Sequence, residues 1–108
     1  MNSLRWISLP GFAPPQAGTR RFLRVEDRSL LVFCIDDVMH AIEDGCPHAG
    51  ASFFGASLEG CVVKCPAHGL RFDLRTGCMV GGPGLKLKKL PIVFLDGTWR
   101  VAFDEPPA

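Results

Sequence analysis

Short apolar runs separated by turn signals recur along this chain and predict β-strands throughout. The clearest runs lie at residues 22–25, 29–35, 38–43, 92–95 and 98–103. The pairs between them, Glu26-Asp27, Asp36-Asp37 and Asp96-Gly97, suit tight turns, and Asp-Gly is the strongest hairpin signal because it tolerates positive φ. Twelve glycines and nine prolines interrupt every stretch that could form a long helix. The predicted fold class is therefore all-β.

A segment of different composition lies between these strands. Residues 45–84 are dense in Gly, Pro, Cys and His, with short predicted strands only at 60–64 and 70–73. Residues 10–18 and the tail 104–108 are predicted to be unstructured. A chain of 108 residues indicates a single domain, which we predict to be a β-scaffold carrying a small loop-rich subdomain at about 45–84.

Composition and charge narrow the possible functions. A net charge of +1 supplies no strong overall field, which argues against binding to nucleic acid or anionic lipid. The short basic groups Arg20, Arg21 and Arg24, and Lys86, Lys88 and Lys89, are best explained as solvated faces. The N-terminus lacks the apolar stretch of a signal peptide, and the longest apolar run, 30–35, is too short to cross a bilayer. We therefore expect a cytoplasmic protein without membrane contact.

Two sequence motifs each combine a thiol and an imidazole. The first is Cys46-Pro47-His48 and the second is Cys65-Pro66-Ala67-His68-Gly69. Five cysteines rule out a complete disulfide framework, and in a reducing compartment they favour metal binding or buried thiols. Each motif lies in a proline-stiffened loop, so less conformational entropy is lost when the ligands converge on a metal.

The pattern C-x-H, a spacer, then C-x-x-H-G resembles the Rieske ferredoxin family closely. Residues 70–77 resemble the strand and turn that follow the second ligand loop in that family, and Gly81-Gly82-Pro83-Gly84 resembles its third, covering loop. The resemblance extends from about Ile7 to Phe103. It implies an antiparallel, β-sandwich-like Rieske fold with one [2Fe–2S] cluster.

The resemblance also implies a ligand set. Cys46 and Cys65 would bind one iron, and His48 and His68 would bind the other, near the surface, where electrons pass. Two thiolates and two neutral imidazoles leave the oxidised centre uncharged, whereas four thiolates would leave it at −2. Histidine ligation therefore raises the potential to about −150 to +300 mV, against about −400 mV for four-cysteine clusters.

Three departures from high-potential relatives predict a potential near the bottom of this range. The positions of an extra disulfide are Ala51 and Ala67, the residue after the second His-Gly is Leu70 rather than serine, and the chain has no tyrosine. Each missing hydrogen bond or disulfide leaves negative charge on sulfur less stabilised.

The expected function is that of a one-electron carrier, not an enzyme, because no activated nucleophile or phosphate-binding loop is present. The resemblance implies transient partners: a reductase as donor and a terminal, aromatic-ring-hydroxylating oxygenase as acceptor. Alternatives are the Rieske-like small subunit of an assimilatory nitrite reductase, a Cys₂His₂ zinc site, and an empty site. Nothing suggests more than a monomer.

The remaining cysteines and the third histidine receive structural interpretations. Cys34 lies in an apolar strand and is predicted to be a core residue. Cys61 and Cys78 flank the second ligand loop, and a disulfide between them is an open but disfavoured alternative. His40 stands apart from both motifs, so we expect a packing or solvent-facing role rather than ligation.

The aromatic residues near the first loop allow two interpretations. Core packing of both Phe53 and Phe54 is favoured. Alternatively, one side chain points inward while the other stays exposed beside the cluster, where it would suit a small, transient redox interface. Trp6 and Trp99 are predicted to anchor the core or edge of the scaffold.

Overall fold

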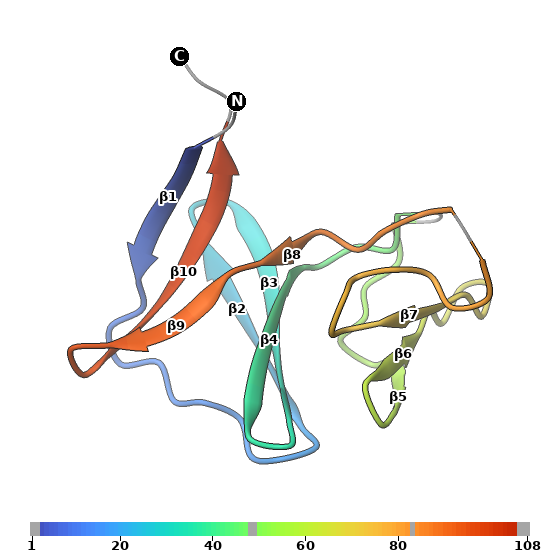
Figure 1. Ribbon diagram of the computed structural model, residues 1–108, viewed down its shortest axis with the longest axis horizontal. Coiled ribbons are helices and arrows are strands. Elements are labelled where there is room, and N and C mark those ends of the chain that lie inside the picture. The colour runs from blue at the N-terminus through green and yellow to red at the C-terminus, as the bar shows by residue number, and fades with distance from the viewer. Residues whose placement is uncertain (1–2, 48–49, 83, 106–108) are drawn as a thin grey trace.

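The described part of the fold consists of three antiparallel sheets. The computed structural model describes residues 3–47, 50–82 and 84–105, and this part of the chain contains no helix, hence none that could span a membrane. The strands are β1 (Ser3–Ser8), β2 (Arg20–Val25), β3 (Arg28–Ile35), β4 (Val38–Glu43), β5 (Ser57–Glu59), β6 (Val62–Lys64), β7 (Arg71–Asp73), β8 (Lys89–Leu90), β9 (Ile92–Leu95) and β10 (Thr98–Glu105). The sheet orders are β1-β10-β9, β2-β3-β4-β8 and β5-β6-β7, with the four-stranded sheet between the other two (Figure 1). The predicted all-β fold class is confirmed.

Three two-residue turns connect the hairpins of the scaffold. Strand pairing ends immediately on either side of Glu26-Asp27, Asp36-Asp37 and Asp96-Gly97. Both residues of each pair have positive φ, between 51° and 77°. Positive φ at both central positions is the requirement of the type I′ turn, whose twist matches that of the flanking strands. All three predicted turns are confirmed.

Strand β3 is buried on both faces and separates two hydrophobic cores. Leu31, Phe33 and Ile35 pack with the residues of the loop-rich segment, forming what we call the first core. Leu30 and Val32 point to the opposite face and pack with β10 and its neighbours, forming the second core. This alternation follows from the two-residue period of a strand. The loop-rich segment therefore packs against one face of the four-stranded sheet.

The structure also departs from the predicted elements in several places. Strand β2 begins two residues earlier than expected, and β1, β5 and β8 were not predicted. Asp104 and Glu105 were expected in an unstructured tail, but they extend β10 and pair with Leu4 and Ser3. Pairing with the first strand of the chain supplies backbone hydrogen bonds that local sequence does not reveal. Residues 10–18 form no strand, as expected.

Candidate metal centre

The first ligand loop begins at Cys46 and closes on itself through backbone hydrogen bonds. The Cys46 amide donates to the Ala51 carbonyl at 2.8 Å, and the Gly50 amide donates to the Cys46 carbonyl at 2.7 Å. Gly50 has φ of 72°, in the left-handed region that favours glycine. Two backbone hydrogen bonds at Cys46 thus close the loop.

The second ligand loop repeats this geometry. The Cys65 amide donates to the Leu70 carbonyl at 2.7 Å, and the Gly69 amide donates to the Cys65 carbonyl at 2.9 Å. Gly69 has φ of 75°. Both loops therefore place a proline one residue, and a left-handed glycine four residues, after the cysteine. The Cys-Pro-x-x-Gly repeat was available in the sequence as a signal that the two loops are structurally equivalent.

The two loops bring the thiols of Cys46 and Cys65 together in a buried position. Cys46 is 3% exposed and Cys65 is 0% exposed. Burial raises the pKa of Cys65, but a hydrogen bond with the Cys46 side chain and backbone hydrogen bonds from Ala67 and His68 oppose this effect, and the net direction is downward. N–H groups directed at a sulfur favour the thiolate, which is the metal-binding form. The site therefore offers two adjacent, buried thiols as candidate metal ligands.

The histidine half of the predicted ligand set is only partly described. His68 is exposed on the second loop, whereas the predicted ligand His48 lies outside the described residues, as does Pro83 of the predicted third loop. Within the described ranges, no three His, Cys, Asp or Glu side chains gather so as to hold one metal ion. Two buried thiols and an exposed imidazole on the second loop are a donor set that would fit a two-iron group.

Asp44 fastens the first loop to the scaffold. Its carboxylate accepts hydrogen bonds from the Phe53 amide at 2.8 Å and from the Ser52 hydroxyl at 2.5 Å. Its own amide donates to the Ser29 carbonyl at 2.7 Å, and the Ser52 hydroxyl accepts from the Phe54 amide at 3.1 Å. Sequence reasoning gave Asp44 no role. An acidic residue two positions before a ligand cysteine was the only local signal, because its partners follow the loop.

Arg20 corrects the prediction of a solvated basic face on β2. Its guanidinium donates to the Phe53 carbonyl at 2.7 Å and lies over the ring of Phe33, 5.0 Å from the centroid. It therefore ties β2 to the segment after the first loop. Arg21 and Arg24 are exposed, as predicted.

The predicted lysine face is corrected in the same way. Lys88 forms an ion pair with Glu43 at 3.3 Å. Lys89 is half-buried and approaches His40 and the Arg75 carbonyl, whereas Lys86 is exposed. Two of these three lysines thus have structural partners.

Phe53 and Phe54 have different environments, which corrects the favoured prediction that both pack in the core. Phe53 is 0% exposed and meets the Phe72 ring edge-on, with centroids 5.9 Å apart. Phe54 is 56% exposed and touches only the edge of the exposed Phe22 among the ring contacts described. The chain turns at this point, with the Ala56 amide donating to the Phe53 carbonyl at 3.2 Å, so Phe53 lies in the core while Phe54 lies on the exposed side of the turn.

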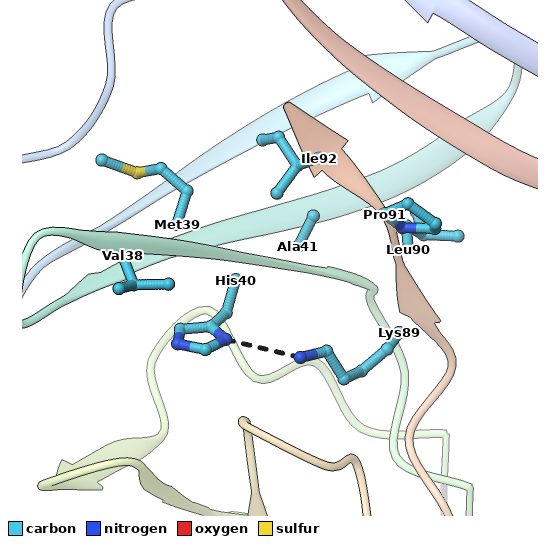
Figure 2. Close-up of a pocket in the computed structure, with 8 residues that line it drawn as sticks. All are labelled: Val38, Met39, His40, Ala41, Lys89, Leu90, Pro91 and Ile92. Carbon is cyan, nitrogen blue, oxygen red and sulfur yellow. Dashed lines mark hydrogen bonds between the residues drawn. The ribbon is translucent and has the colours of Figure 1, made fainter. Parts of the chain in front are cut away.

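His40 is buried, so its role is packing rather than exposure to solvent. Figure 2 shows its ring directed toward Lys89, whose Nζ lies 3.4 Å from Nδ1. Burial, reinforced by the Lys89 charge, lowers the pKa of His40. Lys89 also donates to the Arg75 carbonyl at 3.1 Å. These contacts link β4 and β8 to the turn after β7, where the loop-rich segment joins the scaffold.

The remaining singled-out residues have structural positions. Cys34 is buried in β3, as predicted, and Cys61 and Cys78 are half-buried free thiols rather than a disulfide. Trp99 is half-buried on β10, and Trp6 is 45% exposed on the edge strand β1. None of them lies in the ligand loops.

Comparisons with known proteins give matches over most of the chain. The family model described as the Rieske [2Fe-2S] domain matches residues 13–91. Over 84 residues the chain is 37% identical to Ferredoxin CarAc of Metapseudomonas resinovorans, covering 77% of this chain and 78% of that protein. Over 93 residues it is 34% identical to the 3-phenylpropionate/cinnamic acid dioxygenase ferredoxin subunit of Photorhabdus laumondii, covering 84% and 87%.

A solved structure shows the same architecture. The chain matches one chain in the complex of reduced oxygenase and oxidized ferredoxin in carbazole 1,9a-dioxygenase, with a TM-score of 0.77 and 30% identity. The match covers 95% of this chain and 97% of that one.

Proposed function

The chain belongs to the Rieske [2Fe–2S] domain family, and from this premise we propose that it carries single electrons from a reductase to a terminal, aromatic-ring-hydroxylating oxygenase. The observation that carries the proposal is the pair of equivalent loops that present two buried thiols beside an exposed imidazole. Relatives with dioxygenase ferredoxin names support the oxygenase as acceptor. They favour this function over that of a nitrite reductase subunit.

The ligands proposed are Cys46 and Cys65 on one iron, and His48 and His68 on the other. The residues described fit a [2Fe–2S] group, because the thiols are buried and adjacent and the Cys65 sulfur accepts backbone hydrogen bonds. When bound, the group supplies a centre that takes up and releases one electron. The protein's part is to exclude water from the thiolates while leaving His68 at the surface, where a partner can approach.

A low potential is part of the proposal. Ala51 and Leu70 are only partly buried against the first core, and neither side chain can donate a hydrogen bond to sulfur. No tyrosine is available to do so either. With Ala67 in place of the second disulfide cysteine, these residues support a midpoint near the bottom of the Rieske range, about −150 mV.

The setting of this function is inferred from the same premise. We propose that the chain acts as one cytoplasmic domain, monomeric and free of membrane and nucleic acid, with residues 45–84 as the cluster-binding subdomain and transient contacts to both partners. A permanent complex with a large reductase flavoprotein would contradict this arrangement and revive the nitrite reductase alternative. Gel filtration of the purified protein, alone and with candidate partners, distinguishes the two.

The test of the cluster and its ligands is an anaerobic redox titration followed by electron paramagnetic resonance. We expect a reduced-state signal of low average g, as mixed Cys/His ligation produces, and a midpoint near −150 mV. A midpoint some hundreds of millivolts higher would keep the cluster but refute the reasoning on potential. A colourless protein containing zinc would overturn the function itself. His68→Ala should abolish the signal, whereas His40→Gln should preserve it.

A further inference from the structure

The small sheet of the loop-rich segment carries two cations in direct cross-strand opposition. Lys64 on β6 is opposite Arg71 on β7, and on its other side it is opposite Ser57 on β5. Lys64 and Arg71 are both exposed, whereas Val63 and Phe72, the next residues along their strands, are 0% exposed in the first core. The row Ser57–Lys64–Arg71 therefore faces solvent.

This arrangement does not stabilise the sheet. Like charges directly opposite each other on neighbouring strands are destabilising. In the described part of the chain, neither Lys64 nor Arg71 has an ion-pair or hydrogen-bond partner from a side chain. Other basic residues do have acidic partners, in the pairs Arg5–Glu26, Arg75–Asp73 and Lys88–Glu43. The repulsion between Lys64 and Arg71 therefore destabilises the sheet locally, and no acidic side chain in the described part of the chain offsets it.

The pair adjoins the second ligand loop. Cys65 follows Lys64 directly, and a Cβ built on Gly69 would lie 3.3 Å from the Lys64 Cε, so the lysine stem rests against that loop. Lys64, Cys65, Pro66 and Gly69 line one depression, which is predominantly polar. Lys64 and Arg71 also line a neighbouring depression over the sheet. Both cations therefore lie at the base of the loop that carries the exposed His68, one on each side of it in sequence.

The charges on this face change sign with distance from the loop. The next row on the same face of the sheet, two residues farther along each strand, is Glu59–Val62–Asp73, and Asp73 accepts a hydrogen bond from the Arg75 guanidinium at 2.9 Å. The cations thus lie in the row nearest the ligand loop, and the acidic side chains lie two rows farther away. A partner with an acidic face is attracted most strongly to the end of the sheet next to the loop that carries His68.

We propose that Lys64 and Arg71 form the docking determinant for an acidic face on a protein redox partner. The inference rests on the proposed electron-carrier function and names the partner chemistry: Asp and Glu side chains around the point where electrons enter the accepting protein. Complementary charge steers encounter and fixes orientation more than it adds affinity. Steering of this kind raises association rates by 10-fold to 1,000-fold and weakens with salt, as general behaviour of charged protein pairs.

The experiment uses two haem proteins of opposite charge as electron acceptors. Reduced holoprotein is mixed in a stopped-flow instrument with acidic cytochrome b5 or with basic cytochrome c, at low and at high ionic strength. In the Lys64→Glu, Arg71→Glu double variant, we expect electron transfer to cytochrome b5 to slow about tenfold at low salt. Transfer to cytochrome c should become faster, and both differences should vanish at high salt.

The matched control is the Arg21→Glu, Arg24→Glu double variant on β2. It changes the net charge by the same amount, but its residues lie on an edge strand of the four-stranded sheet. The ratio of the two rates should change less than twofold in this control. Equal changes in both double variants, or none in either, would overturn the docking proposal while leaving the electron-carrier function intact.

Failure of the proposed function has a different signature. A parent protein without a reducible cluster transfers no electrons to either acceptor, and then both proposals fall. If the charge-reversal variant does not retain its cluster spectrum, the neutral variant Lys64→Gln, Arg71→Gln replaces it, with about half the effect on the logarithm of the rate ratio. An unchanged ratio in a cluster-bearing neutral variant also overturns the docking proposal.

Discussion

Asp44→Ala should accelerate loss of the cluster far more than it destabilises the scaffold. The substitution removes a hydrogen bond of 2.8 Å from the Phe53 amide and one of 2.5 Å from the Ser52 hydroxyl. A hydrogen bond to a charged group contributes about 1.5–3 kcal/mol, and we take about 1.5 kcal/mol for the bond from the Phe53 amide. The bond from the Ser52 hydroxyl adds only about 0.5 kcal/mol, because Ser52 is exposed. The total is about 2 kcal/mol, which corresponds to about 30-fold in the opening of the first loop.

The assay is iron release to a strong chelator under anaerobic conditions, followed by loss of visible absorbance. Asp44→Asn retains one acceptor oxygen and should give an intermediate acceleration of about fivefold. Asp37→Asn is the matched control, because Asp37 lies in an exposed turn with φ of 63°, a conformation that asparagine also adopts. Iron release from a folded Asp44→Ala protein at the parental rate would refute the role of Asp44. So would equal acceleration by the control.

Three further predictions concern stability. Gly77→Ala should lower the free energy of unfolding by about 1–3 kcal/mol. Gly77 has φ of +82°, and a Cβ added there would lie 3.2 Å from the Leu87 carbonyl oxygen. An unchanged melting temperature would contradict this expectation. Phe53→Ala should cost about 3–5 kcal/mol in denaturant unfolding, whereas Phe54→Ala should cost less than about 1 kcal/mol. The pKa of His40 is lowered in the folded protein, so folding favours the neutral imidazole. The contribution of His40 to the free energy of unfolding is therefore constant above the ordinary pKa of about 6.5 and is lost as pH falls below that value. His40→Gln should therefore flatten stability between pH 7.5 and 5, and an unchanged slope would argue against the burial effect.

The parts of the fold that could be predicted from sequence are those determined by neighbouring residues. The type I′ turns depend on two adjacent residues that tolerate positive φ. The ligand loops depend on a proline and a glycine near each cysteine, and the central strands depend on unbroken apolar runs. For these features, the conformation that neighbouring residues favour is the one that the structure contains.

The parts that could not be predicted depend on distant partners. Strand β1 pairs with β10, at the opposite end of the chain, and its apolar residues Leu4 and Trp6 are about half exposed, so the strand depends more on that pairing than on a buried face of its own. Arg20 meets a carbonyl 33 residues away, and nothing near it distinguishes it from Arg21. Sequence also could not decide which of two adjacent phenylalanines would face the core, because that depends on how the loop before them ends.

The division of the molecule by β3 has a consequence for how the protein is matured. The second core contains neither the thiols nor any residue of the ligand loops. A newly synthesised chain without iron should therefore already possess a stable platform, with its unfinished side confined to the face that carries the first core. Cluster insertion would then order the side that carries the first core, on a scaffold that is already folded.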